Sequence, residues 1–272
     1  MGVTLSNNSA LTSVAELALV NRVDSDVTID SNAVLVHLSL PSLHEVDGLL
    51  WIKSNGSLRF MDFPTLGTLS RLQIESCPVL PDLQGLNNVA FINGNCAILE
   101  CPSLTTLNGL GGGTLSQIGG SFTVTHCINL TDLSALSLLT WVAQLRFETC
   151  DALKDLTPLS HLTTLLYGVH FLRNASLEKL DGLEGIQFLG ANGGSVEIDG
   201  NPHLTDVMAL SHLLADPASG YKVTGACYIR NNCGLTPGKG LTDAKAWDLV
   251  NAWGGASAVQ GTIIITNNLS AG

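Results

Sequence analysis

The stretch L-Q-I-E-S-C-P-V-L-P-D-L-Q-G-L (72–86) contains the pattern that decides the fold of this chain. Apolar residues alternate up to Cys77, and leucines then follow at every third position, at Leu80, Leu83 and Leu86. The pattern recurs along the chain, aligned on an Asn or Cys that we call the anchor. The anchors are Asn8, Asn32, Asn55, Cys77, Cys101, Cys127, Cys150, Asn174, Asn201, Asn232 and Asn268. Their spacing of 22 to 36 residues is typical of a solenoid, in which each repeat forms one coil.

Each anchor follows a short apolar segment. Positions −5 and −3, counted from the anchor, are apolar throughout, as in Leu72 and Ile74 or Val196 and Ile198. Alternation with a period of two predicts a strand with one buried face. Strands that return once per coil stack in parallel, about 4.8 Å apart. The anchor is expected to point inward, where an Asn amide satisfies backbone groups and a Cys fits as a small buried residue.

The residues after each anchor are apolar at positions +3, +6 and usually +9, as in Leu130, Leu133 and Leu136. A period of three predicts short 3₁₀-like or polyproline-like segments with one inward side chain per turn. Two late insertions rich in Gly or Pro, 184–194 and 211–225, are expected to be loops.

One α-helix is predicted over 242–253. Thr242 is its expected N-cap, and Trp247, Val250 and Trp253 form its expected apolar face, packed on the back of the solenoid. The predicted fold class is therefore mainly β: a parallel solenoid of about eleven coils of 22–36 residues with one late α-helix. Because the repeat runs end to end and neither end carries a polar cap, we expect one solenoid over 1–272 that is a segment of a longer protein.

Composition limits the function classes. The net charge is −11 with a pI near 4.8 and only 13% charged residues, which argues against nucleic acid as a partner. No apolar run reaches the 18 or so residues that span a bilayer. Low charge with many Ser, Thr, Asn and Gly is typical of an extracellular or cell-surface protein. No cofactor is expected.

The spacing after the anchor points to a family. The next Leu comes three residues after the anchor in N-A-S-L (174–177), N-P-H-L (201–204) and C-I-N-L (127–130), whereas a standard leucine-rich repeat has two. With the preceding strand, this resembles the receptor L-domain family, the ligand-binding modules of insulin and epidermal growth factor receptors. Segments 120–133 and 194–207 carry the resemblance best. It implies a right-handed β-helix whose sheet binds proteins or sugars; a microbial or protist surface protein with the same repeat is the alternative.

Positions −4 and −2 are expected to point outward from each strand. In four late repeats these positions, together with Arg173 at position −1, bring polar and charged side chains close to one another. We call this group the charged sheet face. Its members are Arg146, Glu148, His170, Arg173, Glu197, Asp199, Tyr228 and Arg230. Mixed charge with Tyr and Arg on a rigid sheet suits a protein or carbohydrate ligand. The alternative is a solvated surface with cross-strand ion pairs.

Catalytic chemistry has weaker support. Glu148, Glu197 and Asp199 are candidate carboxylates of a β-helix polysaccharide-active enzyme, because neighbouring strands allow the required separation. However, no GxSxG occurs, and the seven histidines form no HxH or HExxH. We therefore predict no catalytic residue and no metal site. A non-enzymatic extracellular binding or adhesion module is favoured over a structural segment of a larger surface assembly or filament, which would associate through its ends or with neighbouring domains.

Cysteines and sequons complete the sequence evidence. Side chains on stacked parallel strands point the same way, so free thiols are expected among the seven Cys; a Cys227–Cys233 disulfide is the alternative. N-x-S/T sequons occur at Asn7, Asn55, Asn129, Asn174 and Asn268. Asn7 and Asn129 are the candidate glycosylation sites, because the other three are anchors.

Overall fold

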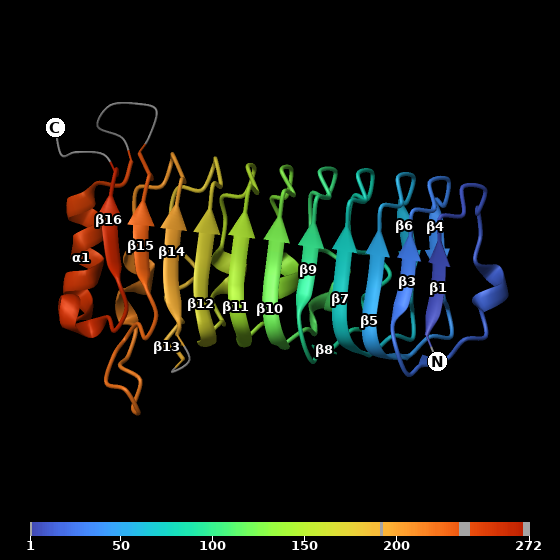
Figure 1. The fold of residues 1–272 in the computed structure, drawn as a ribbon, viewed down its shortest axis with the longest axis horizontal. Helices are drawn as coiled ribbons and strands as arrows, with labels where there is room; N and C mark the ends of the chain where they lie inside the picture. The colour runs from blue at the N-terminus through green and yellow to red at the C-terminus, as the bar shows by residue number, and fades with distance from the viewer. Residues whose placement is uncertain (1, 191–192, 234–239, 269–272) are drawn as a thin grey trace. The chain divides into compact units, whose positions relative to one another are not determined.

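The structure is a computed structural model that describes residues 2–190, 193–233 and 240–268. It shows a mainly-β parallel solenoid with one α-helix among the described residues, near the C-terminus (Figure 1). The chain divides into two compact units, Met1–Leu139 and Thr140–Gly272.

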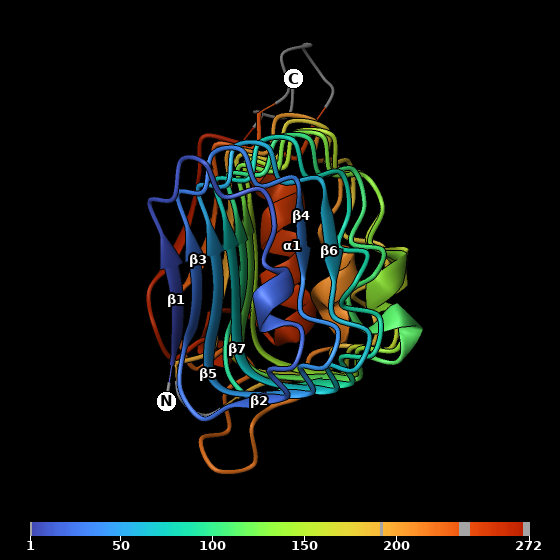
Figure 2. The same ribbon diagram turned by 90° about the vertical axis from the view of Figure 1, so that its right-hand side faces the viewer.

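The first unit is built on one parallel sheet. Its strands pair in the order β1 (Val3–Ser6), β3 (Val27–Asp30), β5 (Glu45–Lys53), β7 (Thr68–Glu75), β9 (Cys96–Leu99) and β10 (Gln117–Thr125). Short strands β2 (Arg22–Val23) and β8 (Phe91–Ile92) extend this sheet. Strands β4 (His37–Ser39) and β6 (Phe60–Asp62) pair on a second wall of the coils (Figure 2). The 3₁₀ helices are η1 (Ala15–Leu17), η2 (Gly111–Gly113) and η3 (Ser134–Leu136).

The second unit repeats this plan. Strands β11 (Trp141–Glu148), β12 (Thr164–Leu172), β14 (Ser195–Asp199), β15 (Cys227–Arg230) and β16 (Ile263–Thr266) pair in that order, all parallel. The 3₁₀ helices are η4 (Thr157–Leu159), η5 (Met208–His212) and η6 (Ala256–Ala258), and the α-helix is α1 (Asp243–Trp253). Segment 184–194 is more than the expected loop, because it contains β13 (Phe188–Leu189), which pairs with β12; residues 191 and 192 lie outside the described part.

The strand register places equivalent positions of successive repeats side by side. Val27 pairs with Leu50 in the first unit, and Val169 pairs with Val196 in the second. These −5 residues are fully buried. The leucines at positions +3, +6 and +9 after the anchors from Asn32 to Asn201 are buried too, and the 3₁₀ segments fall among such leucines, whereas Leu11 and Leu17 of the first coil are half-buried. The register and the inward leucines predicted from the repeat are therefore confirmed.

The anchor asparagines form hydrogen-bonded ladders. Asn201 shows the pattern: its Nδ2 donates to the carbonyl of Phe171, 2.9 Å away, and its Oδ1 accepts from the backbone N–H of Asn174, also at 2.9 Å. Asn55 makes the equivalent bonds: its Oδ1 accepts from the backbone N–H of Asn32, and its Nδ2 donates to the carbonyl of Ile29. Anchors Asn32, Asn55, Asn174, Asn201, Asn232 and Asn268 are buried, as predicted. Asn8 is not: it is exposed, because only the coil of Asn32 packs beside it in the described residues.

Cysteine anchors occupy the same slot with weaker bonds. The Sγ of Cys127 lies 3.8 Å from the carbonyl of Ile98, the position that an Asn amide would reach. All seven cysteines are free, and six are buried. Burial raises the pKa of Cys127 to about 11 and that of Cys96 to about 12, so these thiols stay protonated at neutral pH. Cys227 and Cys233 do not form the alternative disulfide.

The residue before each anchor adopts a left-handed backbone conformation, which the repeat alignment did not predict. Its φ lies between 52° and 71° at every one of these positions. Ser, Asn or Gly stands there in most repeats, as at Ser31, Gly200 and Asn231, and Asn and Gly tolerate this conformation best. Larger or β-branched side chains occur at Glu100, His126, Thr149 and Arg173. For an ordinary L-residue the conformation costs about 1 kcal/mol.

Helix α1 differs from its prediction in two ways. Thr242 caps it as expected, with its Oγ1 accepting from the N–H of Lys245. However, Trp247 is 40% exposed, because the buried stripe follows positions 246, 249, 250 and 253 around the helix. The helix also packs beside β16 and η5 rather than on the back of the coils (Figure 1).

The ladder of the second unit continues into α1. The carboxylate of Asp243 accepts from the backbone N–H of Asn268 at 3.1 Å and from its Nδ2 at 2.8 Å. An aspartate of the helix thus supplies the oxygen that an anchor Asn supplies elsewhere. No helix of the described residues is long and apolar enough to cross a bilayer.

Candidate functional site

Four strands of the second unit position the charged sheet face. The register aligns Arg146, His170, Glu197 and Tyr228 in one row across β11, β12, β14 and β15. A second row holds Glu148, Leu172, Asp199 and Arg230. Because alternate side chains of a strand point to the same side, both rows face away from the buried core residues. The structure therefore brings the predicted residues together.

One half of the face is organised around Glu148. This carboxylate forms an ion pair with Arg146, whose Nε donates a hydrogen bond to Oε2 at 3.1 Å, and a second ion pair with Arg173. The Glu148 side chain is only 12% exposed, whereas that of Arg173 is 60% exposed. Two guanidinium groups thus hold one largely covered carboxylate in place, and Arg173 stays largely exposed to solvent.

The other half is organised around Arg230. Its Nε donates to Oδ2 of Asp199 at 2.8 Å, and its Nη2 donates to Oε1 of Glu197 at 3.4 Å. The guanidinium also lies over the ring of Tyr228, 5.0 Å from its centroid. Asn231 donates to the second oxygen of Asp199 at 2.8 Å. These contacts fix an aromatic ring and two carboxylates in one patch.

His170 joins the two halves. Its Nδ1 lies 3.5 Å from Nη1 of Arg146 and 3.9 Å from Oε2 of Glu197, and its Nε2 lies 2.8 Å from Oγ of Ser195. Burial and then the neighbouring Arg146 lower the pKa of His170 to about 4, so the imidazole is neutral at pH 7. Since a guanidinium only donates, Nδ1 accepts and Nε2 carries the proton that is donated to Ser195.

The order Ser195, His170, Glu197 resembles a catalytic triad, but its proton arrangement is reversed. In a serine hydrolase, Nε2 accepts the serine proton while Nδ1–H donates to the carboxylate. Here Nε2 donates, and the Ser195 hydroxyl donates onward to the carbonyl of Tyr167, 3.4 Å away. His170 in this tautomer therefore positions Ser195 and does not activate it.

The free energy of unfolding is expected to depend on pH through His170. Between pH 7 and pH 4, we expect the wild-type protein to lose about 3 kcal/mol more stability than His170→Gln. The pKa of His170 is about 4 in the folded protein, below its ordinary value of 6.5. The unfolded chain therefore takes up the proton first, and the stabilisation by neutral His170 is complete above pH 6.5 and is lost as the pH falls toward 4.

Denaturant titrations of both proteins at pH 7 and pH 4 measure this difference. Glutamine is the matched replacement, because it can donate to Ser195 and accept from Arg146 without titrating. The same pH dependence in both proteins would contradict the assignment of a neutral His170.

Sequence reasoning missed Ser195. This residue stands before the alternating part of β14, and it aligns with Gly168 of β12. Gly168 has φ 111° and lies after a register shift between β11 and β12, which leaves an extra residue in β12. A glycine inside a strand often marks a bulge or a close backbone approach. Gly168 was therefore the available indication that the neighbouring strand comes close at this point.

Comparisons with known proteins leave the family open. No model of a known protein family matches the chain. No curated protein matches it either. Within residues 2–190, 193–233 and 240–268, no three His, Cys, Asp or Glu side chains are grouped so that they could hold a metal ion.

Proposed function

We propose that the chain is a non-enzymatic, extracellular or cell-surface ligand-binding module that presents the charged sheet face to a protein or a glycan. The observation that carries this proposal is the connected network from Arg173 through Glu148, Arg146 and His170 to Glu197 and Arg230. Strand pairing and these contacts hold the side chains before a ligand arrives, so little conformational entropy is lost on binding.

The charges of the face balance. Three arginines stand against three carboxylates, although the chain as a whole carries −11. A ligand would therefore be recognised by hydrogen bonds and by contact with Tyr228 rather than by a strong net field. Hydroxyl-rich sugars and polar protein surfaces have that chemistry.

The proposal also includes the winding of the coils and the glycosylation sites, which are both inferred from the repeat. A right-handed winding of about eleven coils, related to receptor L-domains, accounts for the anchor spacing. Asn7 and Asn129 are exposed, which supports them as glycosylation sites on a secretory route. The other three sequon asparagines are buried with their amides bonded in the ladders.

A polysaccharide-active enzyme is a weaker proposal. Glu148, Glu197 and Asp199 each have an arginine partner, whereas a glycosidase needs one protonated carboxyl in a cleft. The depressions described in the second unit lie elsewhere, at Lys154 and Glu178 and at Thr205 and Lys245. Among the described residues, the two features that such an enzyme needs, an unpaired carboxyl and a cleft at the charged sheet face, thus lack support.

Substitutions in the charged sheet face test its proposed role in ligand binding. In a screen of the full chain against glycan and protein arrays, we expect a ligand whose affinity falls at least about tenfold in both Arg146→Ala and Tyr228→Ala. Arg59→Ala is the matched control, because Arg59 is an exposed arginine of the first unit. Unchanged affinity in both test variants, or an equal loss in the control, would refute the site.

A further inference from the structure

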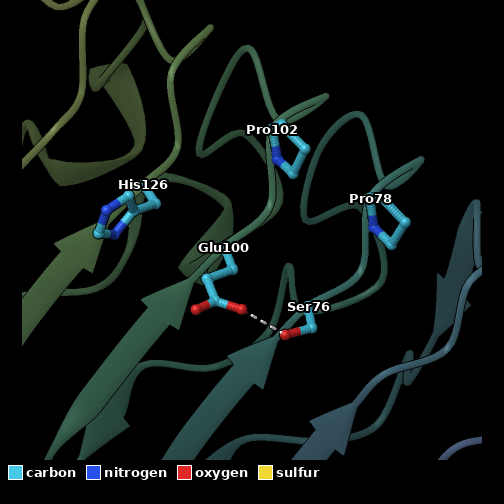
Figure 3. A pocket seen from close by; sticks show the side chains of 5 residues that line it. All are labelled: Ser76, Pro78, Glu100, Pro102 and His126. Atoms are coloured by element: carbon cyan, nitrogen blue, oxygen red, sulfur yellow. Dashed lines mark hydrogen bonds between the residues drawn. The ribbon is translucent and has the colours of Figure 1, made fainter.

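A depression of about 400 Å³ lies in the first unit, at the ends of β7, β9 and β10. Five residues line it: Ser76, Pro78, Glu100, Pro102 and His126 (Figure 3). Three of them stand just before an anchor and two just after one. The depression thus follows the turns of three successive coils, apart from the charged sheet face of the second unit.

The two prolines give the depression rigid apolar walls. Pro78 and Pro102 occupy equivalent positions of neighbouring coils, and Figure 3 shows their rings on adjacent turns. A pyrrolidine ring has no N–H and little freedom to move, so it offers a fixed surface to an aliphatic chain. Its size and mainly apolar lining with a few polar groups agree with those of small-molecule and side-chain pockets.

Glu100 supplies an uncompensated charge. One oxygen of its carboxylate accepts from the Ser76 hydroxyl at 2.7 Å, and Figure 3 shows the other pointing away from Ser76. No basic side chain among the described residues pairs with Glu100. Glu75, in contrast, pairs with Lys53 at 3.7 Å. The carboxylate in this depression is therefore open to a cation from outside.

The residue types at the turns of this depression differ from those of most repeats. Glu100 and His126 have φ of 54° and 55°, at the position where most repeats carry Ser, Asn or Gly. A glutamate or histidine is stabilised less well in this conformation than Asn or Gly. Strained residues of this kind concentrate at binding sites. Two of the four bulkier residues at this turn position, Glu100 and His126, line the same depression.

We propose that this depression binds an arginine side chain of a protein or peptide partner. The aliphatic part of the arginine lies along Pro78 and Pro102, and the guanidinium donates to the Glu100 carboxylate. A planar guanidinium matches a carboxylate with two parallel hydrogen bonds, whereas an ammonium acts as a point charge. This site does not depend on the charged sheet face, so either proposal stands if the other fails.

Nuclear magnetic resonance titration of the full chain with Nα-acetylarginine N-methylamide tests the proposal. The citrulline analogue is the matched probe, because it has nearly the same shape without the charge. We expect saturable shifts at the amides of Ser76, Glu100 and His126 with the arginine probe, and at least about threefold weaker binding of the citrulline probe. Equal affinity for the two probes, or no saturable shift at these amides, would overturn the proposal.

Glu100→Gln is the decisive variant, with Glu16→Gln as its control. Both glutamates are exposed in the first unit, so both variants are expected to fold. Binding of the arginine probe should weaken at least about threefold in Glu100→Gln and stay unchanged in Glu16→Gln. An unchanged affinity in Glu100→Gln, or an equal loss in both variants, would also overturn the proposal.

Discussion

Replacing Gly168 with alanine is expected to destabilise the protein by about 4 kcal/mol. A Cβ at this position would lie 1.9 Å from the carbonyl oxygen of Ser195 and 2.5 Å from its nitrogen. Both atoms belong to the backbone of the adjacent strand, so the clash is relieved only if β12 and β14 separate. The φ of 111° adds strain for any residue with a side chain. Denaturant unfolding of the purified variant measures the loss.

Gly220→Ala separates the two causes. Gly220 also has a positive φ, 74°, but a Cβ there meets nothing within 4 Å. Its substitution should cost only about 1 kcal/mol, the backbone part of the effect. A similar loss in both variants would show that close strand approach is not what requires glycine at position 168.

Asn201→Ala is expected to destabilise the protein by a similar amount, about 4 kcal/mol. The substitution leaves the buried N–H of Asn174 and the carbonyl of Phe171 without their side-chain partners. Each buried polar group that loses its only hydrogen bond costs about 1–3 kcal/mol. Thermal or denaturant unfolding, compared with the wild type, measures the effect.

Two further substitutions make this prediction specific to the ladder. Asn201→Cys should lose less stability than Asn201→Ala, because a cysteine occupies the equivalent slot at Cys127, within 3.8 Å of the carbonyl. Asn251→Ala, on the exposed side of α1, should change stability by less than about 1 kcal/mol. Equal losses in the Ala and Cys variants of Asn201 would contradict a hydrogen-bonding role for the anchor cysteines.

Much of the fold was predictable because the repeat translates sequence position into spatial position. Once Cys77 aligns with Asn55, Leu72 must lie beside Leu50 and Gln73 beside Trp51, and the structure shows this register. The same argument placed Arg146 beside His170 and Tyr228 beside Glu197. Neighbours across the parallel sheet follow from local pattern alone, since a shift by one residue would turn the apolar face outward.

Other features were not predictable from the repeat. Ser195 contacts His170 because an extra residue in β12 lets the backbone at Gly168 approach β14. Arg146 fixes the tautomer of His170 only because its guanidinium bends toward Nδ1 rather than toward solvent. Side-chain directions of this kind depend on all neighbours at once, and the one-dimensional pattern does not contain them.

The sequence by itself determined the coil, its buried leucines, its anchor and the rows of side chains on the sheet, because each depends on a short period that burial enforces. Only the tertiary structure decided how polar groups are satisfied. It placed Asp243 of α1 on Asn268, left the Glu100 carboxylate without a basic partner among the described residues, and joined Arg173 to Glu148. The physical reason is that hydrogen bonds and charges depend on distances of a few ångströms between separate coils, which insertions and side-chain rotamers set.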